Sequence, residues 1–518
     1  MSASRRITPG LVGVPGSVDV VVVGLGVTGA GVALDAASRG LAVLAVDAFD
    51  LAWGTSRFSS KLVHGGLRYL ASGQVGIAHE SAVERGILME VTAPHLTRPL
   101  PTIVPLAPGV TRPMGVLTRA AVVGGDLLRR AAGTSADTLP KPRRLTAAET
   151  RRLAPPLRAD GLRGAVLGWD GQLEDDARLV TTIARTAADG GAAVHTHARV
   201  VAATGTEVTL RDELTGETTT VRTRAVINAA GVWAGDIVDD VRLRPSRGTH
   251  LVLRGDALPG LDVAVFAPVP GVRNRYVLVL PQPDGQIYVG LTDEPADGPV
   301  PDVAEPTEVE IGFLLDVVAA SFSRPLRRSD VVGAFAGLRP LLDRGDESTA
   351  DLSRKHAVLT SPSGVVTIVG GKLTTYRRMA EDAVDTAVAR SGLRAGPCVT
   401  AELPLAGAAP RVRLAELLER AETPGHARLV RRFGTDAALV LDAAREATGL
   451  PDDDLLAPVD TTIPVTLAEL VFGVTHEGAA DVDDLLDRRT RVGLVPADRV
   501  RAVPAAERAL ALALSPNR

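Results

Sequence analysis

A glycine-rich turn directly follows a short apolar run near the N-terminus, and this combination constrains the fold more than any other feature. The run, residues 20–23, is four valines, which suits a strand buried on both faces of a parallel sheet. An alanine-rich segment follows the turn, and Gly40 beyond it is typical of a helix C-terminus. The turn has the spacing GxGxxG and consists of Gly24, Gly26 and Gly29.

A second apolar run, residues 41–46, ends at Asp47, about 20 residues beyond the turn, where dinucleotide-binding domains carry an acid. In such a turn the first glycine allows the tight bend, the second lets the backbone approach a pyrophosphate, and the third lets helix pack on strand. The helix N-terminus offers unpaired amides to phosphates, and the acid accepts hydrogen bonds from ribose hydroxyls. Since all parts occur in order, the segment predicts a dinucleotide-binding unit, although a lone GxGxxG would be weak evidence.

Composition excludes several other classes of protein. The chain has 518 residues, 45% of them hydrophobic and 23% charged, which is enough for two or three globular domains. Its net charge of −4 gives no global field that would attract nucleic acid. The single cysteine, Cys398, cannot form an intrachain disulfide, and no cluster predicts a metal site, so a reducing cytosol is expected. No uninterrupted apolar stretch reaches the ~20 residues that span a bilayer.

The two ends of the chain differ from its middle. Residues 1–16 are interpreted as a flexible arm, because cleavage of a signal peptide at the apolar run would destroy the glycine turn. From about Val399 to Arg518 the composition shifts to helical segments rich in Ala, Leu, Arg and Asp. We expect a separate C-terminal helical domain there, whose many Asp–Arg pairs would form a solvated surface.

The middle of the chain repeats the strand-then-glycine pattern. Apolar runs lead into glycine turns near Gly24, Gly231 and Gly370, and long inserts separate the three. Between 241 and 330, short runs punctuated by Pro and Gly are typical of an antiparallel sheet. A dinucleotide domain assembled from three separated segments, with a sheet domain inserted, favours a flavoprotein over a simple nicotinamide enzyme.

Several longer motifs make the chain recognisable. They are GTSRFSSKLVHGGLRYL from Gly54, WDGQLEDDARLV from Trp169, GLTDE from Gly290, GLRPL from Gly337, LSRKH from Leu352, VGGKLTTYR from Val369 and THEGAADVDDLLDRRTR from Thr475. In this order they closely resemble the FAD-dependent glycerol-3-phosphate dehydrogenases, over about residues 18 to 500. The resemblance implies a non-covalent FAD and oxidation of sn-glycerol 3-phosphate to dihydroxyacetone phosphate. It also implies electron transfer to membrane quinone and a peripheral membrane contact at the cytoplasmic face; a homodimer is left open, and no nucleic acid is expected.

The fold implied by the resemblance is α/β (α+β overall). It combines a discontinuous Rossmann-like FAD domain of the glutathione-reductase/D-amino-acid-oxidase type, an inserted antiparallel-sheet substrate domain and the C-terminal helical domain. The FAD domain would take residues 17–92, 165–240 and 331–398, the substrate domain 93–164 and 241–330, and the helical domain 399–518.

The resemblance also assigns cofactor-binding residues. Asp47 and the glycines of the first turn would hold the ADP half, and residues 59–61 would flank the phosphates. The helix N-terminus at Gly371–Thr374 would stabilise negative charge at the pyrimidine edge of the flavin. The full set is Gly24, Gly26, Gly29, Asp47, Thr55, Ser56, Ser59, Ser60, Lys61, His64, Gly65, Val200, Ala230, Gly231, Trp233, Gly371, Lys372, Leu373 and Thr374.

A phosphate dianion in a closed pocket needs several cations, and hydride removal from an alcohol needs a base for the hydroxyl proton. By family correspondence the substrate-binding residues are Arg68, Tyr69, Arg339, Arg354 and Lys372. His250 is the expected base, since histidine accepts a proton near neutral pH, and Arg354 and Arg339 are expected to assist catalysis. His64 is the alternative base, although its neighbouring glycines favour close packing against flavin.

Three alternatives stay open at this point. A glycerol-3-phosphate oxidase would pass electrons to oxygen in place of quinone. A non-catalytic flavin-binding scaffold would have no need of the four cations Arg68, Arg339, Arg354 and Lys372. An amine-oxidising relative of similar architecture would be reduced by an amino acid.

Overall fold

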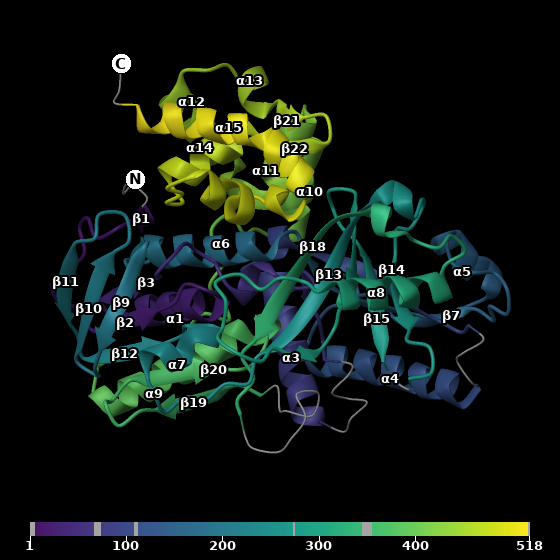
Figure 1. Ribbon diagram of the computed structural model, residues 1–518, viewed down its shortest axis with the longest axis horizontal. Helices are drawn as coiled ribbons and strands as arrows, with labels where there is room; N and C mark the ends of the chain where they lie inside the picture. The colour runs from purple at the N-terminus through teal and green to yellow at the C-terminus, as the bar shows by residue number, and fades with distance from the viewer. Residues whose placement is uncertain (1–5, 67–73, 108–111, 273–274, 344–354, 516–518) are drawn as a thin grey trace.

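The computed structural model describes residues 6–66, 74–107, 112–272, 275–343 and 355–515. Within these ranges two large sheets lie beside each other and a group of C-terminal helices lies above them (Figure 1). The first sheet has the strand order β1-β8-β3-β2-β12-β20-β19 and is parallel except at β19. Its strands are β1 (Thr8–Pro9), β2 (Val20–Val23), β3 (Val43–Val46), β8 (Ala193–Thr196), β12 (Ala225–Asn228), β19 (Ala357–Thr360) and β20 (Val366–Val369).

The four valines of β2 are buried because both faces of this sheet are covered. Val20 and Val22 pack against the helices α1 (Val27–Ser38), α6 (Asp176–Asp189) and α9 (Tyr376–Ser391). Val21 and Val23 pack in a second cluster with a three-stranded meander. The meander consists of β9 (Ala198–Ala203), β10 (Glu207–Asp212) and β11 (Thr218–Arg222). Burial on both faces explains why the strand is uniformly apolar instead of alternating.

The three strand-then-glycine motifs converge on one edge of the first sheet. β12 pairs in parallel with β2 on one side and with β20 on the other, so these three strands are neighbours. The carboxyl ends of parallel strands meet at the same edge, and ligands of open α/β sheets bind outside that edge. The glycine turns near Gly24, Gly231 and Gly370 therefore surround one place, although long inserts separate them in sequence.

The second sheet carries the insert. Its order is β17-β13-β16-β15-β14-β5-β7-β4, with β18 beside β13 and β6 beside β7, and most pairs are antiparallel. The strands are β4 (Leu62–Val63), β5 (Thr97–Pro105), β6 (Arg143–Leu145), β7 (Ala165–Leu173), β13 (Ser246–Arg254), β14 (Ala264–Pro268), β15 (Tyr276–Pro281), β16 (Gln286–Gly290), β17 (Glu294–Pro295) and β18 (Val331–Arg339). Helices α3 (Val75–Ile87), α4 (Arg112–Ala131), α5 (Ala147–Leu153) and α8 (Glu308–Ser321) accompany it.

Four segments depart from the expected division of the chain. Part of the expected flexible arm is ordered, because Thr8–Pro9 pairs in parallel with β8 at the edge of the first sheet. β4, β7 and β18, expected in the FAD domain, lie in the second sheet. β18 pairs with β13 along nearly its whole length, from Ser246↔Arg339 to Leu253↔Val331, so this long non-local pairing decides its place.

The C-terminal part is a helical cluster with its own apolar core, as the sequence predicts. It lies over α6 and beside one end of β18 (Figure 1). Its helices are α10 (Arg411–Glu419), α11 (Pro424–Phe433), α12 (Ala437–Thr448), α13 (Asp452–Leu456), α14 (Leu467–Thr475), the short η9 (Asp484–Arg489) and α15 (Pro496–Leu514), with a small β21–β22 hairpin. The fold class expected from the sequence is confirmed. Among the described helices, none combines the length and apolarity needed to cross a bilayer.

Candidate active site

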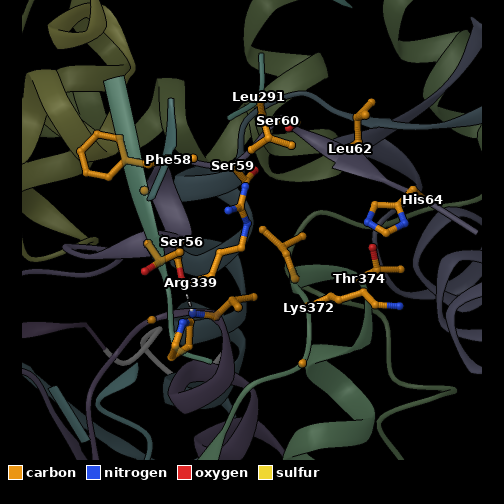
Figure 2. Close-up of a pocket in the computed structure, with 18 of the residues that line it drawn as sticks. Ser56, Phe58, Ser59, Ser60, Leu62, His64, Leu291, Arg339, Lys372 and Thr374 are labelled. Carbon is orange, nitrogen blue, oxygen red and sulfur yellow. Dashed lines mark hydrogen bonds between the residues drawn. The ribbon is translucent and has the colours of Figure 1, made fainter. Parts of the chain in front are cut away.

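One large cavity lies where the two sheets meet, with a volume of about 1230 Å³. Its wall takes residues from the glycine turns of the first sheet and from β13 and β18 of the second. Figure 2 shows labelled side chains from separate parts of the chain, residues 56–64, Leu291, Arg339 and residues 372–374, around this space. The wall contains most of the cofactor-binding residues predicted from the sequence: Gly24, Gly26, Asp47, Thr55, Ser56, Ser59, Ser60, His64, Gly65, Val200, Ala230, Gly231, Trp233, Gly371, Lys372, Leu373 and Thr374.

The glycine turn after β2 has no room for side chains. Gly24 has a φ of +96°, and a Cβ there would lie 2.7 Å from the carbonyl oxygen of Ala229. A Cβ on Gly29 would lie 1.7 Å from the carbonyl oxygen of Gly24. Gly29 therefore does not line the cavity but lets α1 pack directly on the turn, as the third glycine of such a motif should. Gly26, the N-cap of α1, offers no capping side chain, and Ser56 Oγ accepts from Val27 N at 2.9 Å. Gly26, Val27 and Thr28 line the cavity, so the helix N-terminus faces it as a site for a pyrophosphate.

Asp47 sits at the end of β3 with both carboxylate oxygens engaged. Oδ2 accepts from Leu25 N at 2.6 Å and Oδ1 accepts from Phe49 N at 3.0 Å. A carboxylate has about four acceptor positions, so two remain for ribose hydroxyls. Burial raises the pKa of Asp47 to about 6, and the two backbone donors offset only part of that effect.

FAD affinity should consequently depend on pH through Asp47. Ribose hydroxyls that donate to this carboxyl favour its ionised form, so FAD binding lowers its pKa below about 6. The dissociation constant should be flat above about pH 7 and rise by up to about tenfold per unit as pH falls below 6. Flavin fluorescence titrations between about pH 5 and 8 would measure it. Asp47→Asn should bind more weakly and without this slope; an equal slope in both proteins would contradict the assignment.

The aromatic side of the cavity also fits a bound dinucleotide. Trp53 and Phe49 line it and stack on each other, with ring centroids 4.3 Å apart. The indole Nε1–H of Trp53 is buried and has no acceptor within the described residues. Buried donors are nearly always satisfied, so this one is suited to a polar ligand. Neither aromatic residue was predicted as a site residue. Both lie within six residues after Asp47, and this closeness to the predicted ribose-binding acid could have indicated them.

Lys61 corrects one expectation. It was assigned to the cofactor, but its side chain is fully buried away from the cavity wall. Its ammonium donates to Asp176 Oδ2 at 2.8 Å and to the carbonyl of Arg57 at 2.6 Å. A buried ammonium needs such partners, so Lys61 joins the 54–61 loop to α6. The neighbouring Ser59 and Ser60 do line the cavity.

His250 lies on β13 in the wall of the cavity and is completely buried. Its Nε2 is 2.8 Å from Ser60 Oγ, and its Nδ1 has no hydrogen-bond partner in the described part of the chain. The ring stacks on Phe335 at 4.9 Å, and a Cβ on Gly290 would lie 2.2 Å from Cδ2 of the ring. Burial, with Lys61 and Arg339 nearby, lowers the pKa of His250 to about 3. The imidazole is thus held in its neutral form, and its low pKa makes it a weak base until a bound phosphate dianion raises that pKa.

Two of the predicted substrate-binding cations lie on the same cavity. Arg339, at the end of β18, donates to Asp293 Oδ1 at 3.0 Å and to the carbonyl of Thr292 at 3.1 Å. Lys372 donates to Ser81 Oγ at 2.6 Å from the turn after β20. These bonds fix both side chains in the wall. The other predicted substrate residues, Arg68, Tyr69 and Arg354, lie outside the described residues.

A further pair in the wall was not predicted as a site. Arg85 Nη1 is 2.7 Å from Asp170 Oδ1, and the same oxygen accepts from Gly65 N at 3.0 Å. A Cβ on Gly65 would lie 2.4 Å from Arg85 Nη1, so a larger residue there would displace the guanidinium from Asp170. Asp170 belongs to the WDGQ motif and Gly65 to the HGGLR motif. The hydrogen bond between them therefore joins two of the motifs on which the family resemblance rests.

Fold and cavity together define a flavin-dependent oxidoreductase. A family model described as FAD dependent oxidoreductase matches residues 19–377, and one described as C-terminal domain of alpha-glycerophosphate oxidase matches 398–515. A Mycobacterium tuberculosis protein named glycerol-3-phosphate dehydrogenase 1 is 52% identical over 95% of this chain and 94% of its own length. The glycerol-3-phosphate dehydrogenase of Bacillus halodurans, solved with FAD, superimposes with a TM-score of 0.73 at 28% identity, over 96% of this chain and 90% of that one. The chain belongs to the FAD-dependent glycerol-3-phosphate dehydrogenase family, and its cofactor is FAD.

Proposed function

We propose that this protein oxidises sn-glycerol 3-phosphate to dihydroxyacetone phosphate and passes the electrons to a membrane quinone. One observation supports the proposal most strongly. Arg339, Lys372 and His250 line one cavity, together with the cradle for the dinucleotide. The names of the relatives, of which one is 52% identical, point to the same substrate.

Bound FAD supplies the hydride acceptor. The residues of the chain supply binding, orientation and the proton acceptor. Arg339 and Lys372 neutralise the phosphate, Arg as a planar fork and Lys as a point charge. By family correspondence Arg68, Tyr69 and Arg354 complete this site. His250 takes the hydroxyl proton, and its stacking on Phe335 and bond to Ser60 hold the ring in place for that transfer.

The electron acceptor separates this proposal from the oxidase. The C-terminal family model carries the name of an oxidase, whereas the curated relatives with 52% and 37% identity are named dehydrogenases. The 52% identity to a protein named a dehydrogenase supports an acceptor other than oxygen, and quinone is the acceptor that the family resemblance implies. We place the protein at the cytoplasmic face of the membrane as a peripheral protein, since a quinone dissolved in the bilayer must reach the flavin.

With glycerol 3-phosphate in air-saturated buffer, a soluble quinone should be reduced in about one-to-one ratio to substrate consumed, with little peroxide. Quinone reduction is followed by absorbance, and peroxide by a peroxidase-coupled dye in a parallel sample. Stoichiometric peroxide with idle quinone would overturn the quinone assignment. In a cell lysate the activity should sediment with the membrane fraction; full activity in the supernatant would contradict the membrane location.

A further inference from the structure

The C-terminal cluster reaches the cofactor loop through a buried carboxylate. Asp50, three residues after Asp47, is completely buried. Arg489 donates to both of its oxygens, from Nη1 at 2.7 Å and from Nη2 at 2.8 Å. Arg488 donates to the same carboxylate from Nε at 2.7 Å. Both arginines belong to η9, so one short segment of the C-terminal domain holds the loop that carries the ribose-binding acid.

The same segment supports the aromatic wall of the cavity. The guanidinium of Arg488 lies 4.9 Å from the ring centroid of Trp53, which stacks on Phe49. Both rings line the cavity, whereas Arg488 itself does not. A cation over an aromatic face is attracted to it, more strongly where water is excluded. A contact thus runs from the C-terminal domain through two stacked rings to the space beside the cofactor.

A third contact holds the turn between β8 and β9, whose backbone bonds to residues 47 and 49. Asp484 Oδ2 lies 3.2 Å from His197 Nε2, and Arg488 donates to the other oxygen of Asp484. His197 has a left-handed φ of +54° between β8 and β9, and its backbone N donates to the carbonyl of Phe49. Ala198 N donates to the carbonyl of Asp47 at 2.7 Å. The backbone around Asp47 is therefore tied, through His197, to the same cluster of charges.

Because the charges are buried, Asp50 and the two arginines of η9 each depend on the other to stay in place. Burial alone would lower the pKa of Arg488, but Asp50 and Asp484 outweigh it and raise that pKa, so the guanidinium stays charged. A buried charge is tolerated only while its partners are present, because an unpaired one is very costly. Undocking of η9 would leave Asp50 without both arginines, and a loop that moved away would leave the arginines without Asp50.

We propose that the C-terminal domain is a positioning element for FAD: Arg488 and Arg489 hold residues 47–53 in the shape that binds the adenosine half. Docking of this domain and binding of FAD are then coupled, and the coupling acts equally in both directions. The inference concerns cofactor binding, so it does not depend on the identity of the substrate.

FAD release from the purified holoenzyme tests the proposal. Asp50→Asn keeps the shape of the side chain but removes the charge, and we expect FAD release at least about tenfold faster than in wild type. Asp50→Glu restores a carboxylate and should recover part of the difference. Asp452→Asn is the matched control, since the Arg445–Asp452 pair, 2.6 Å apart, lies within the C-terminal domain and does not join it to the body. Release is followed by the rise in flavin fluorescence after dilution.

Hydrogen exchange of the wild-type protein gives a second measurement that needs no variant. Backbone amides of residues 484–491 should exchange more slowly with FAD bound than after its removal, because coupling is reciprocal. Three results would overturn the proposal. They are release from Asp50→Asn within about twofold of wild type, equal acceleration in Asp50→Asn and Asp452→Asn, and exchange in 484–491 that does not respond to FAD.

Discussion

Replacing His250 by glutamine should lower kcat about 10²- to 10⁴-fold, which is the usual contribution of a positioned general base. Glutamine is close in size and can still bond to Ser60, but its amide cannot accept a proton at ordinary pH. The neighbours that hold the ring, Phe335 and Gly290, stay unchanged, so the fold should be kept.

Steady-state kinetics with glycerol 3-phosphate would measure the effect, and the flavin absorbance of the purified variant would show that FAD is retained. The matched control is His195→Gln, because His195 is also buried but bonds to the carbonyl of Gly10, away from the cavity. That variant should keep kcat within about threefold. If His250→Gln kept kcat within the same range, His250 would not be the base, and the alternative, His64, would become the residue to test.

Gly29→Ala should abolish FAD binding. The new methyl group would lie 1.7 Å from the carbonyl oxygen of Gly24. Cβ atoms in real structures essentially never lie so close to another heavy atom. Either α1 or the turn must move, and the helix N-terminus then no longer faces the pyrophosphate. We expect a protein that is purified without flavin and whose melting temperature is lower.

Gly312→Ala is the control for this substitution. It makes the same change within helix α8, where a Cβ would meet nothing within 4 Å. Alanine favours a helix over glycine by up to about 1 kcal/mol, so this variant should be as stable as wild type or slightly more stable, with full FAD content. A Gly29→Ala protein with normal flavin content would contradict the packing described for the turn.

The dinucleotide half of the site was predictable because its signals are local. A uniformly apolar run before GxGxxG indicated a strand covered on both faces, and β2 is buried in this way. The convergence of Gly231 and Gly370 with Gly24 followed from one rule, that parallel strands end at a common edge. The resemblance of the longer motifs provided the remaining cofactor residues. Of the whole predicted set, all but Gly29 and Lys61 line the cavity.

The features that the sequence could not predict are contacts between residues far apart in the chain. Lys61 reads as a phosphate ligand until its partner Asp176 is seen, 115 positions later. β18 reads as part of the FAD domain because its long pairing with β13 has no local signature. The arginines of the DRRTR motif were interpreted as a solvated surface, and that interpretation is wrong for Arg488 and Arg489. Both are buried, because they pair with Asp50, which lies more than 400 residues earlier.

Anaerobic addition of sn-glycerol 3-phosphate to the purified holoenzyme tests the central claim most directly. The account predicts that the oxidised flavin absorption is bleached, in proportion to substrate, before any acceptor is added. Glycerol without the phosphate should bleach it far more slowly, because Arg339 and Lys372 then have no dianion to bind. A flavin spectrum that glycerol 3-phosphate leaves unchanged would favour the non-catalytic scaffold, and bleaching by an amino acid alone would favour an amine-oxidising enzyme. Either result would contradict the function proposed for this cavity.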